Sequence, residues 1–178
     1  QGGRRGVAGW KDEYECAVRY KEGRVEQAWD SYAAVMSRLA RVLGDKGEVA
    51  EAKAKFERAL EITARTVGAE SESYAAALRD LARVLRDQGE VAEAKAKFER
   101  ALEIKASTVG EESDSYAAAL GDLARVLKGQ GEVAEAKAKF ERALEITAST
   151  VGEESERYAV ALTHLALVLR DHGEGSEA

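Results

Sequence analysis

The strongest constraint in this sequence is an internal repeat of 42 residues. Residues 49–62 recur without change as 91–104 and again as 133–146. The same spacing separates four tyrosines and four glycines: Tyr32, Tyr74, Tyr116, Tyr158, Gly47, Gly89, Gly131 and Gly173. Self-similarity at a fixed period of this size is typical of stacked repeat proteins, in which each unit packs only on its neighbours. The period covers nearly all of the 178 residues.

Each period contains two helical patterns that end at glycine. In the first, helix A, apolar residues recur on one side of a helix before a glycine: Tyr74, Leu78, Leu81, Ala82, Leu85 and Gly89. In the second, helix B, the corresponding residues are Ala94, Phe98, Ala101, Leu102 and Gly110. Alternating apolar and polar residues, the signal of a strand, are absent, and so is proline. The sequence therefore predicts an all-α fold.

The repeat also predicts the domain organisation. One helical hairpin cannot bury enough apolar surface to offset its chain entropy, so consecutive hairpins must stack around a shared core. We expect Gly173 to end the last helix A, and the residues after it to begin another helix B. The prediction is a single solenoid over 1–178, with a partial repeat (helix B) at 7–22, repeats at 28–66, 72–108 and 114–150, and a partial repeat (helix A) at 156–178.

Composition excludes several classes of function. The chain is 34% charged, and no apolar run approaches the ~20 residues that span a bilayer, so we expect no membrane partner. A net charge of −6 argues against nucleic-acid binding. Cys16 is the only cysteine, and His164 and His172, expected to be a surface pair, are the only histidines. No catalytic motif or metal cluster occurs, which predicts a non-enzyme without metal or cofactor. The chain lacks an initial Met and reads as a fragment, and its first residues do not resemble a signal peptide. A cytoplasmic location is therefore expected by default.

Helix A and helix B together resemble a known repeat. The order Leu78, Leu81, Ala82, Leu85, Gly89, Ala94, Phe98 and Ala101 is similar to the tetratricopeptide repeat (TPR) signature, and the 42-residue period resembles the kinesin-light-chain type. The nearly uniform copies are also similar in style to the sensor arrays of STAND (NB-ARC) signalling ATPases. The resemblance implies a right-handed superhelical solenoid of antiparallel helix pairs, without catalytic activity. It also implies a scaffold whose A helices line a concave groove for a peptide or protein. The chain departs from the family in two ways. It lacks the proline that the family has near the end of helix B, and it has no asparagine, the residue that the kinesin type uses to clamp a peptide backbone.

The copies differ mainly on one face of helix A. Helix B changes only at the positions of Thr63 and Arg65, although it too has an exposed face. Random drift at exposed positions should have changed both helices, so the difference favours variation tied to binding. The variable face lies opposite the leucine stripe, and the resemblance places it in the groove. The candidate ligand-binding residues are Ser37, Arg38, Arg41, Asp45, Arg79, Asp80, Arg83, Arg86, Asp87, Asp122, Arg125, Lys128, Thr163, His164, Leu167 and Arg170.

The candidate groove is rich in arginine within an acidic chain. Arg41, Arg83 and Arg125 stand one repeat apart, an arrangement suited to bidentate capture of carboxylates along an extended ligand. This spacing predicts an acidic peptide or acidic protein surface as the partner. The alternative is that the arginines pair with aspartates of the A helices, as Arg83 would with Asp80 or Asp87, and only keep the groove soluble.

A structural role is the second hypothesis for function. The helix B expected at one end of the chain and the helix A expected at the other are complementary halves of one repeat. Such ends would allow chains to stack head to tail through an open heterologous interface. Self-association of this kind is therefore the alternative to recognition of a peptide or protein.

Overall fold

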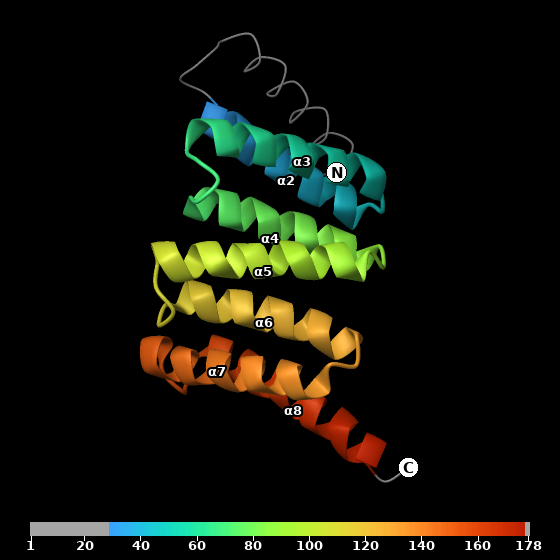
Figure 1. The fold of residues 1–178 in the computed structure, drawn as a ribbon, viewed down its shortest axis with the longest axis vertical. Coiled ribbons are helices and arrows are strands. Elements are labelled where there is room, and N and C mark those ends of the chain that lie inside the picture. The colour runs from blue at the N-terminus through green and yellow to red at the C-terminus, as the bar shows by residue number, and fades with distance from the viewer. Residues whose placement is uncertain (1–28, 177–178) are drawn as a thin grey trace, which may run out of the picture. The chain divides into compact units, whose positions relative to one another are not determined.

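The computed structural model describes residues 29–176, which are helical apart from short turns (Figure 1). The described residues form seven helices and no strand: α2 (Trp29–Asp45), α3 (Val49–Thr66), α4 (Glu72–Asp87), α5 (Val91–Thr108), α6 (Asp114–Gly129), α7 (Val133–Val151) and α8 (Glu156–Ser176). The even-numbered helices are of type A and the odd-numbered ones are of type B. The predicted all-α repeat fold is therefore confirmed. The helix expected at 7–22, with Trp10 and Cys16, lies outside the described residues.

The chain divides into two compact units, Gln1–Gly89 and Glu90–Ala178. In its described part, unit 1 contains α2, α3 and α4, and unit 2 contains α5 to α8. The boundary falls between the two helices of the repeat expected at 72–108. A single solenoid over 1–178 therefore stays a prediction.

Glycines with positive φ separate the helices in both units. Gly47 and Gly131 both have φ of 80°, a left-handed conformation that glycine adopts without steric cost. After α2, the backbone N–H of Gly47 donates to the carbonyl of Gly44 at 2.9 Å, and that of Glu48 donates to Leu43, also at 2.9 Å. These bonds satisfy carbonyls at the end of α2 and reverse the chain into α3. The glycine spacing in the sequence therefore marks real helix ends.

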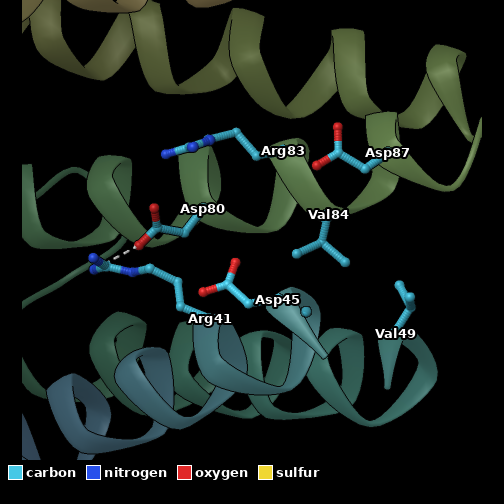
Figure 2. Close-up of a pocket in the computed structure, with 8 residues that line it drawn as sticks. Arg41, Asp45, Val49, Asp80, Arg83, Val84 and Asp87 are labelled. Carbon is cyan, nitrogen blue, oxygen red and sulfur yellow. Dashed lines mark ion pairs between the residues drawn. The ribbon is translucent and has the colours of Figure 1, made fainter. Parts of the chain in front are cut away.

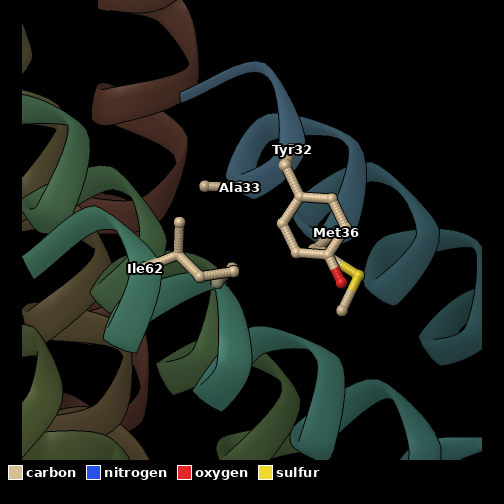
Figure 3. Close-up of a cluster of buried hydrophobic side chains, with 5 residues drawn as sticks. Tyr32, Ala33, Met36 and Ile62 are labelled. Atoms are coloured by element: carbon tan, nitrogen blue, oxygen red, sulfur yellow. The ribbon is translucent and has the colours of Figure 1, made fainter. Parts of the chain in front are cut away.

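The core of unit 1 lies mainly between α2 and α3. Tyr32, Ala33 and Met36 of α2 pack on Ala59 and Ile62 of α3, and all five side chains are buried (Figure 3). A second cluster joins Leu39 and Leu43 of α2 to Ala52 of α3, with Val84 of α4 packed against it. Ala52 and Ala59 of α3 are fully buried, so the backbones of α2 and α3 approach closely at these points.

Unit 2 repeats this packing in α6, α7 and α8. Ala117 and Leu120 of α6 pack on Ala143 and Ile146 of α7. Phe140 of α7 also forms a cluster with Ala124 of α6 and Val168 of α8. Helix α7 therefore contacts both α6 and α8.

One of the two positions at which helix B varies is buried. Thr63 and Thr147 donate their hydroxyl groups to the carbonyls of Ala59 and Ala143, at 2.8 and 2.7 Å. In α5 the same position is Lys105, which is only 2% exposed and whose ammonium group donates to the hydroxyl of Ser115 on α6. A buried polar group needs such a partner. The change from threonine to lysine therefore alters the contact between α5 and α6.

The expectation that Gly173 ends the last helix A is wrong. Helix α8 continues through Gly173 to Ser176, whereas Gly47 and Gly131 turn the chain with positive φ. Those turns are held because a complete helix B packs back on the helix before it. The residues that follow Gly173 in this sequence are Glu, Gly, Ser, Glu and Ala. Gly175 and Ser176 stand where α3 begins with Val49 and Ala50, so the residues that begin a helix B differ at this point.

Two glycines of unit 2 should respond in opposite ways to alanine. Gly121 lies inside α6, and a Cβ atom there would meet nothing within 4 Å. Gly121→Ala should raise the free energy of unfolding by about 1 kcal/mol, because glycine is the poorer helix former. Gly131→Ala should lower it by about 1 kcal/mol or more, because its φ of 80° is unfavourable for a side chain.

Urea denaturation followed by circular dichroism measures both effects. The expected result is a higher midpoint for Gly121→Ala and a lower midpoint for Gly131→Ala than for the unmodified chain. Midpoints that move in the same direction would contradict this account of the turns.

Candidate functional site

A pocket of about 290 Å³ lies in unit 1, on the variable face of the A helices (Figure 2). Its walls come from α2 and α4, with one residue from the start of α3. Five of the residues predicted from the sequence line it: Arg41, Asp45, Asp80, Arg83 and Asp87. The structure thus brings together charged residues from two consecutive A helices. The other lining residues are Gly44, Val49 and Val84.

Gly44 leaves the space that the pocket occupies. The other A helices carry Arg86, Lys128 and Arg170 at the corresponding position. A Cβ atom on Gly44 would lie 3.7 Å from the side chain of Val84, and a longer side chain would extend into the pocket. The candidate residues chosen from the sequence omit Gly44, although its small size in a column of long cations is a signal of open space.

Asp80 and Arg41 form an ion pair across this pocket. A nitrogen of the Arg41 guanidinium lies 3.1 Å from a carboxylate oxygen of Asp80 (Figure 2). The side chain of Asp80 is 18% exposed and that of Arg41 is 59% exposed. Burial raises the pKa of Asp80 above its ordinary value, while the charges of Arg41, Arg83 and Arg79 act in the opposite direction. Asp80 is therefore a half-buried carboxyl group surrounded by cations.

The pairing of arginine with aspartate differs from the scheme suggested by sequence. The sequence predicts that Arg83 pairs with Asp80 or Asp87. In the structure Asp80 pairs with Arg41, and Asp87 pairs with Arg86 at 2.7 Å. Arg83 is exposed, and among the described residues no ion pair joins it to a carboxylate. Within the pocket, Arg83 is thus the arginine whose guanidinium can meet an incoming anion.

In unit 2 the variable face of α6 is more buried than an open groove would be. Asp122 is buried and forms an ion pair with Arg125 one helical turn later. The Arg125 side chain is 37% exposed. One member of the arginine ladder is therefore engaged within its own helix, as the alternative from sequence anticipates.

His164 of α8 is half-buried against an aromatic ring. Its imidazole stacks on Phe140 of α7, with ring centroids 5.6 Å apart and planes inclined by 16°. Burial lowers the pKa of His164, the charges of Arg125 and Lys128 lower it further, and Asp122 opposes them. The expectation of a surface histidine pair is therefore wrong for His164, because the helix places its ring on the core residue Phe140.

The other candidate residues lie outside the pocket. Ser37, Arg79, Arg86, Lys128 and Leu167 are half-buried, and Arg38, Thr163 and Arg170 are exposed. The Thr163 hydroxyl donates to the carbonyl of Ala159 at 2.8 Å. Within residues 29–176, no cluster of His, Cys, Asp and Glu could hold a metal ion, and no helix is long and apolar enough to cross a membrane.

The repeat family follows from comparison with known sequences. The model of the tetratricopeptide repeat matches residues 31–107 and 108–178, well over half of the chain. The chain belongs to the tetratricopeptide repeat family. TPR repeats generally mediate protein–protein interaction, and their arrays are typically non-enzymatic scaffolds. Among curated proteins, no sequence matches the chain.

Several solved structures share the fold of this chain. BtubC (BKLC) from P. vanneervenii matches with a TM-score of 0.85 and 22% identity, over 94% of this chain and 66% of that one. A Podosopora anserina structure described as a kinesin light chain with nearly identical TPR-like repeats matches with a TM-score of 0.80 and 29% identity, over 96% and 81%. The apo form of RapI matches with a TM-score of 0.78 and 19% identity, over 94% and 45%. The chain thus spans less than two thirds of BtubC and under half of RapI, and the predicted likeness to kinesin-light-chain repeats is confirmed.

The raised pKa of Asp80 predicts how its contribution to stability depends on pH. A carboxyl group whose pKa is higher in the folded than in the unfolded state stabilises the fold while it is protonated. This contribution is full below the ordinary pKa of 3.8 and is lost as the pH rises through the raised value. Asp80→Asn cannot titrate, so the unmodified chain should lose stability relative to this variant as the pH rises from about 4.

Urea denaturation of the unmodified chain and of Asp80→Asn at a series of pH values tests this. Taking the difference removes the contributions of all other titrating groups. If the difference in free energy of unfolding between the two proteins is constant with pH, or changes in favour of the unmodified chain as the pH rises, the pKa of Asp80 is not raised.

Cations on α6 should affect the titration of His164. We expect the pKa of His164 to lie below its usual 6.5, and Lys128→Gln to raise it because one repelling charge is removed. Since the folded pKa is depressed, the stability that His164 contributes is lost as the pH falls below about 6.5. An NMR titration of the imidazole C–H signals measures both values, and His164→Gln assigns the resonance. An unchanged pKa in Lys128→Gln would contradict the electrostatic account.

Proposed function

We propose that this TPR chain binds an extended segment of a partner protein along the variable face of its A helices. The pocket between α2 and α4 carries this proposal, because it lies on the face where the copies differ. A specificity-determining surface should vary between repeats while the scaffold is preserved, and helix B is nearly identical in all copies. Within unit 1, the residues that differ between α2 and α4 would then set which side chains of the ligand are bound.

Within this proposal, Arg83 captures an acidic side chain of the ligand. Its guanidinium is exposed in a pocket with apolar walls at Val49 and Val84. Arginine forms paired, charge-assisted hydrogen bonds with carboxylates, and such bonds are stronger where the site is partly shielded from water. Asp80 supports the site by holding Arg41 at its edge. The arginine ladder predicts contacts with an acidic partner at several repeats. The proposal places the anchoring contact at one residue of unit 1, Arg83.

The alternative, head-to-tail stacking of chains, has less support. It requires the helix expected at 7–22, which lies outside the described residues. The pocket, by contrast, consists entirely of described side chains from one unit. Recognition of a partner segment is therefore the function that the described residues favour.

Peptide selection followed by binding measurements tests the proposal. Peptides selected from a random display library against the unmodified chain should be enriched in Asp and Glu. Their affinity, measured by fluorescence anisotropy, should fall about tenfold to a hundredfold in Arg83→Glu, since a hydrogen bond to a charged group contributes about 1.5–3 kcal/mol. Gly44→Arg should have a similar effect because it fills the pocket. Helix A tolerates arginine there, since Arg86 and Arg170 occupy the same position.

Arg58→Glu is the matched control for the charge reversal. Arg58 is exposed on α3, where it pairs with Glu61 at 2.7 Å, and it is not among the residues that line the pocket. This variant should bind the selected peptides with unchanged affinity. Equal binding by Arg83→Glu and Arg58→Glu would exclude the pocket as the site, and selected peptides without acidic residues would exclude an acidic ligand.

A further inference from the structure

Helix α2 lacks a cation that the other A helices carry near their ends. At one position of the repeat the A helices have Gly44, Arg86, Lys128 and Arg170. At the next position they have Asp45, Asp87, Gly129 and Asp171. Of these four adjacent pairs, only the pair in α2 has a carboxylate without a preceding cation. The missing charge belongs to the place where Gly44 and Asp45 line the pocket of unit 1.

Helix α4 shows what this cation does in another copy of the repeat. The Arg86 guanidinium donates to one carboxylate oxygen of Asp87 through two nitrogens, at 3.0 and 2.7 Å. Such a pair neutralises an aspartate at the end of a helix, where the backbone carbonyls already carry partial negative charge. The last turn of α2 contains no basic residue, whereas that of α4 contains Arg86. The end of α2 therefore combines the carboxylate of Asp45 with the negative end of a helix.

Nearby cations do not replace the missing one. Arg41 stands four residues before Asp45, the usual spacing of an ion pair within a helix. Its guanidinium instead pairs with Asp80 of α4 at 3.1 Å. Lys46 follows Asp45 in the sequence, but it is exposed and does not line the pocket. Among residues 29–176, no ion pair joins Asp45 to a cation.

The unpaired charges of the pocket are one cation and one anion. Three carboxylates and two guanidinium groups line it, and two of the carboxylates are paired with arginines. The groups that remain are Arg83 on α4 and Asp45 on α2 (Figure 2). A ligand that covered the pocket with only a carboxylate would pair with Arg83 and leave Asp45 desolvated without a cation, which is unfavourable. The complementary ligand offers a charge of each sign.

We propose that the pocket binds a ligand segment that carries a basic as well as an acidic residue, and that Asp45 selects the basic one. The inference rests on the proposed function, because it concerns the same pocket and the same ligand. The basic group of the ligand takes the place relative to Asp45 that Arg86 has relative to Asp87. The space left by Gly44 beside Val84 accommodates the aliphatic part of that side chain.

A double-mutant cycle on the selected peptides tests the inference. Peptides selected against the unmodified chain should contain Arg or Lys in addition to Asp and Glu. One such peptide is made with arginine at the basic position and again with citrulline, a neutral analogue of similar shape. In fluorescence anisotropy, Asp45→Asn should bind the arginine peptide about threefold to fivefold more weakly than the unmodified chain does, as for one exposed ion pair. The affinity of the citrulline peptide should not change.

Glu61→Gln is the matched control variant. It removes the same charge from an exposed carboxylate of unit 1 that does not line the pocket. Both peptides should bind this variant as they bind the unmodified chain. An effect of Asp45→Asn that is equal for the two peptides, or an effect of Glu61→Gln equal to that of Asp45→Asn, would overturn the inference.

The two proposals fail in different ways. Selected peptides that lack basic residues but lose affinity in Arg83→Glu would overturn the role of Asp45 and leave the proposed function standing. Binding that Arg83→Glu does not weaken would overturn the proposed function, and this inference with it. A selection that yields no binding peptide would do the same.

Discussion

The close contact between helix A and helix B is the interaction on which the rest of this structure depends. Ala52 and Ala59 of α3 are fully buried against the leucines and the thioether of α2. Larger residues at these positions would separate the helices and open voids that a close-packed core does not tolerate. The same contact recurs between α6 and α7, where Ala143 is buried. The stability of each unit therefore rests on a few small residues that occur in each of the described B helices, α3, α5 and α7.

This constraint explains why variation concentrates on the other face of helix A. A change on the packed side of helix B alters a contact with a neighbouring helix, as Lys105 does at a position where the copies have a buried threonine. A change at Gly44 alters the shape of the pocket and leaves the packed side of α2 unchanged. The scaffold thus permits a new binding surface in each repeat at little cost in folding free energy. The uniform helices B and the diverse helices A are two consequences of the same packing.

Sequence periodicity predicts the helices and turns well because both follow from local rules. The apolar spacing determines which side of α4 or α6 is buried, and the glycines at 47 and 131 mark real turns. The ion pairs could not be predicted in the same way. Whether Asp80 meets Arg41 or Arg83 depends on the offset between two helices and on side-chain rotamers, which sequence spacing does not contain. The glycine spacing also does not predict the end of α8, which continues past Gly173 to Ser176.

Asp80, Asp122 and His164 occupy the same position of the repeat and show how that position can change the chemistry of helix A without changing the fold. Asp80 pairs with an arginine of the preceding A helix, whereas buried Asp122 pairs with an arginine of its own helix. His164 has no negative charge to offer the cations on α6, and its ring instead stacks on Phe140. Asp80 and Asp122 each pair with an arginine, whereas the charges of Arg125 and Lys128 lower the pKa of His164. The same position of the repeat therefore has a different electrostatic environment in α4, α6 and α8, although the surrounding repeat sequence is nearly the same.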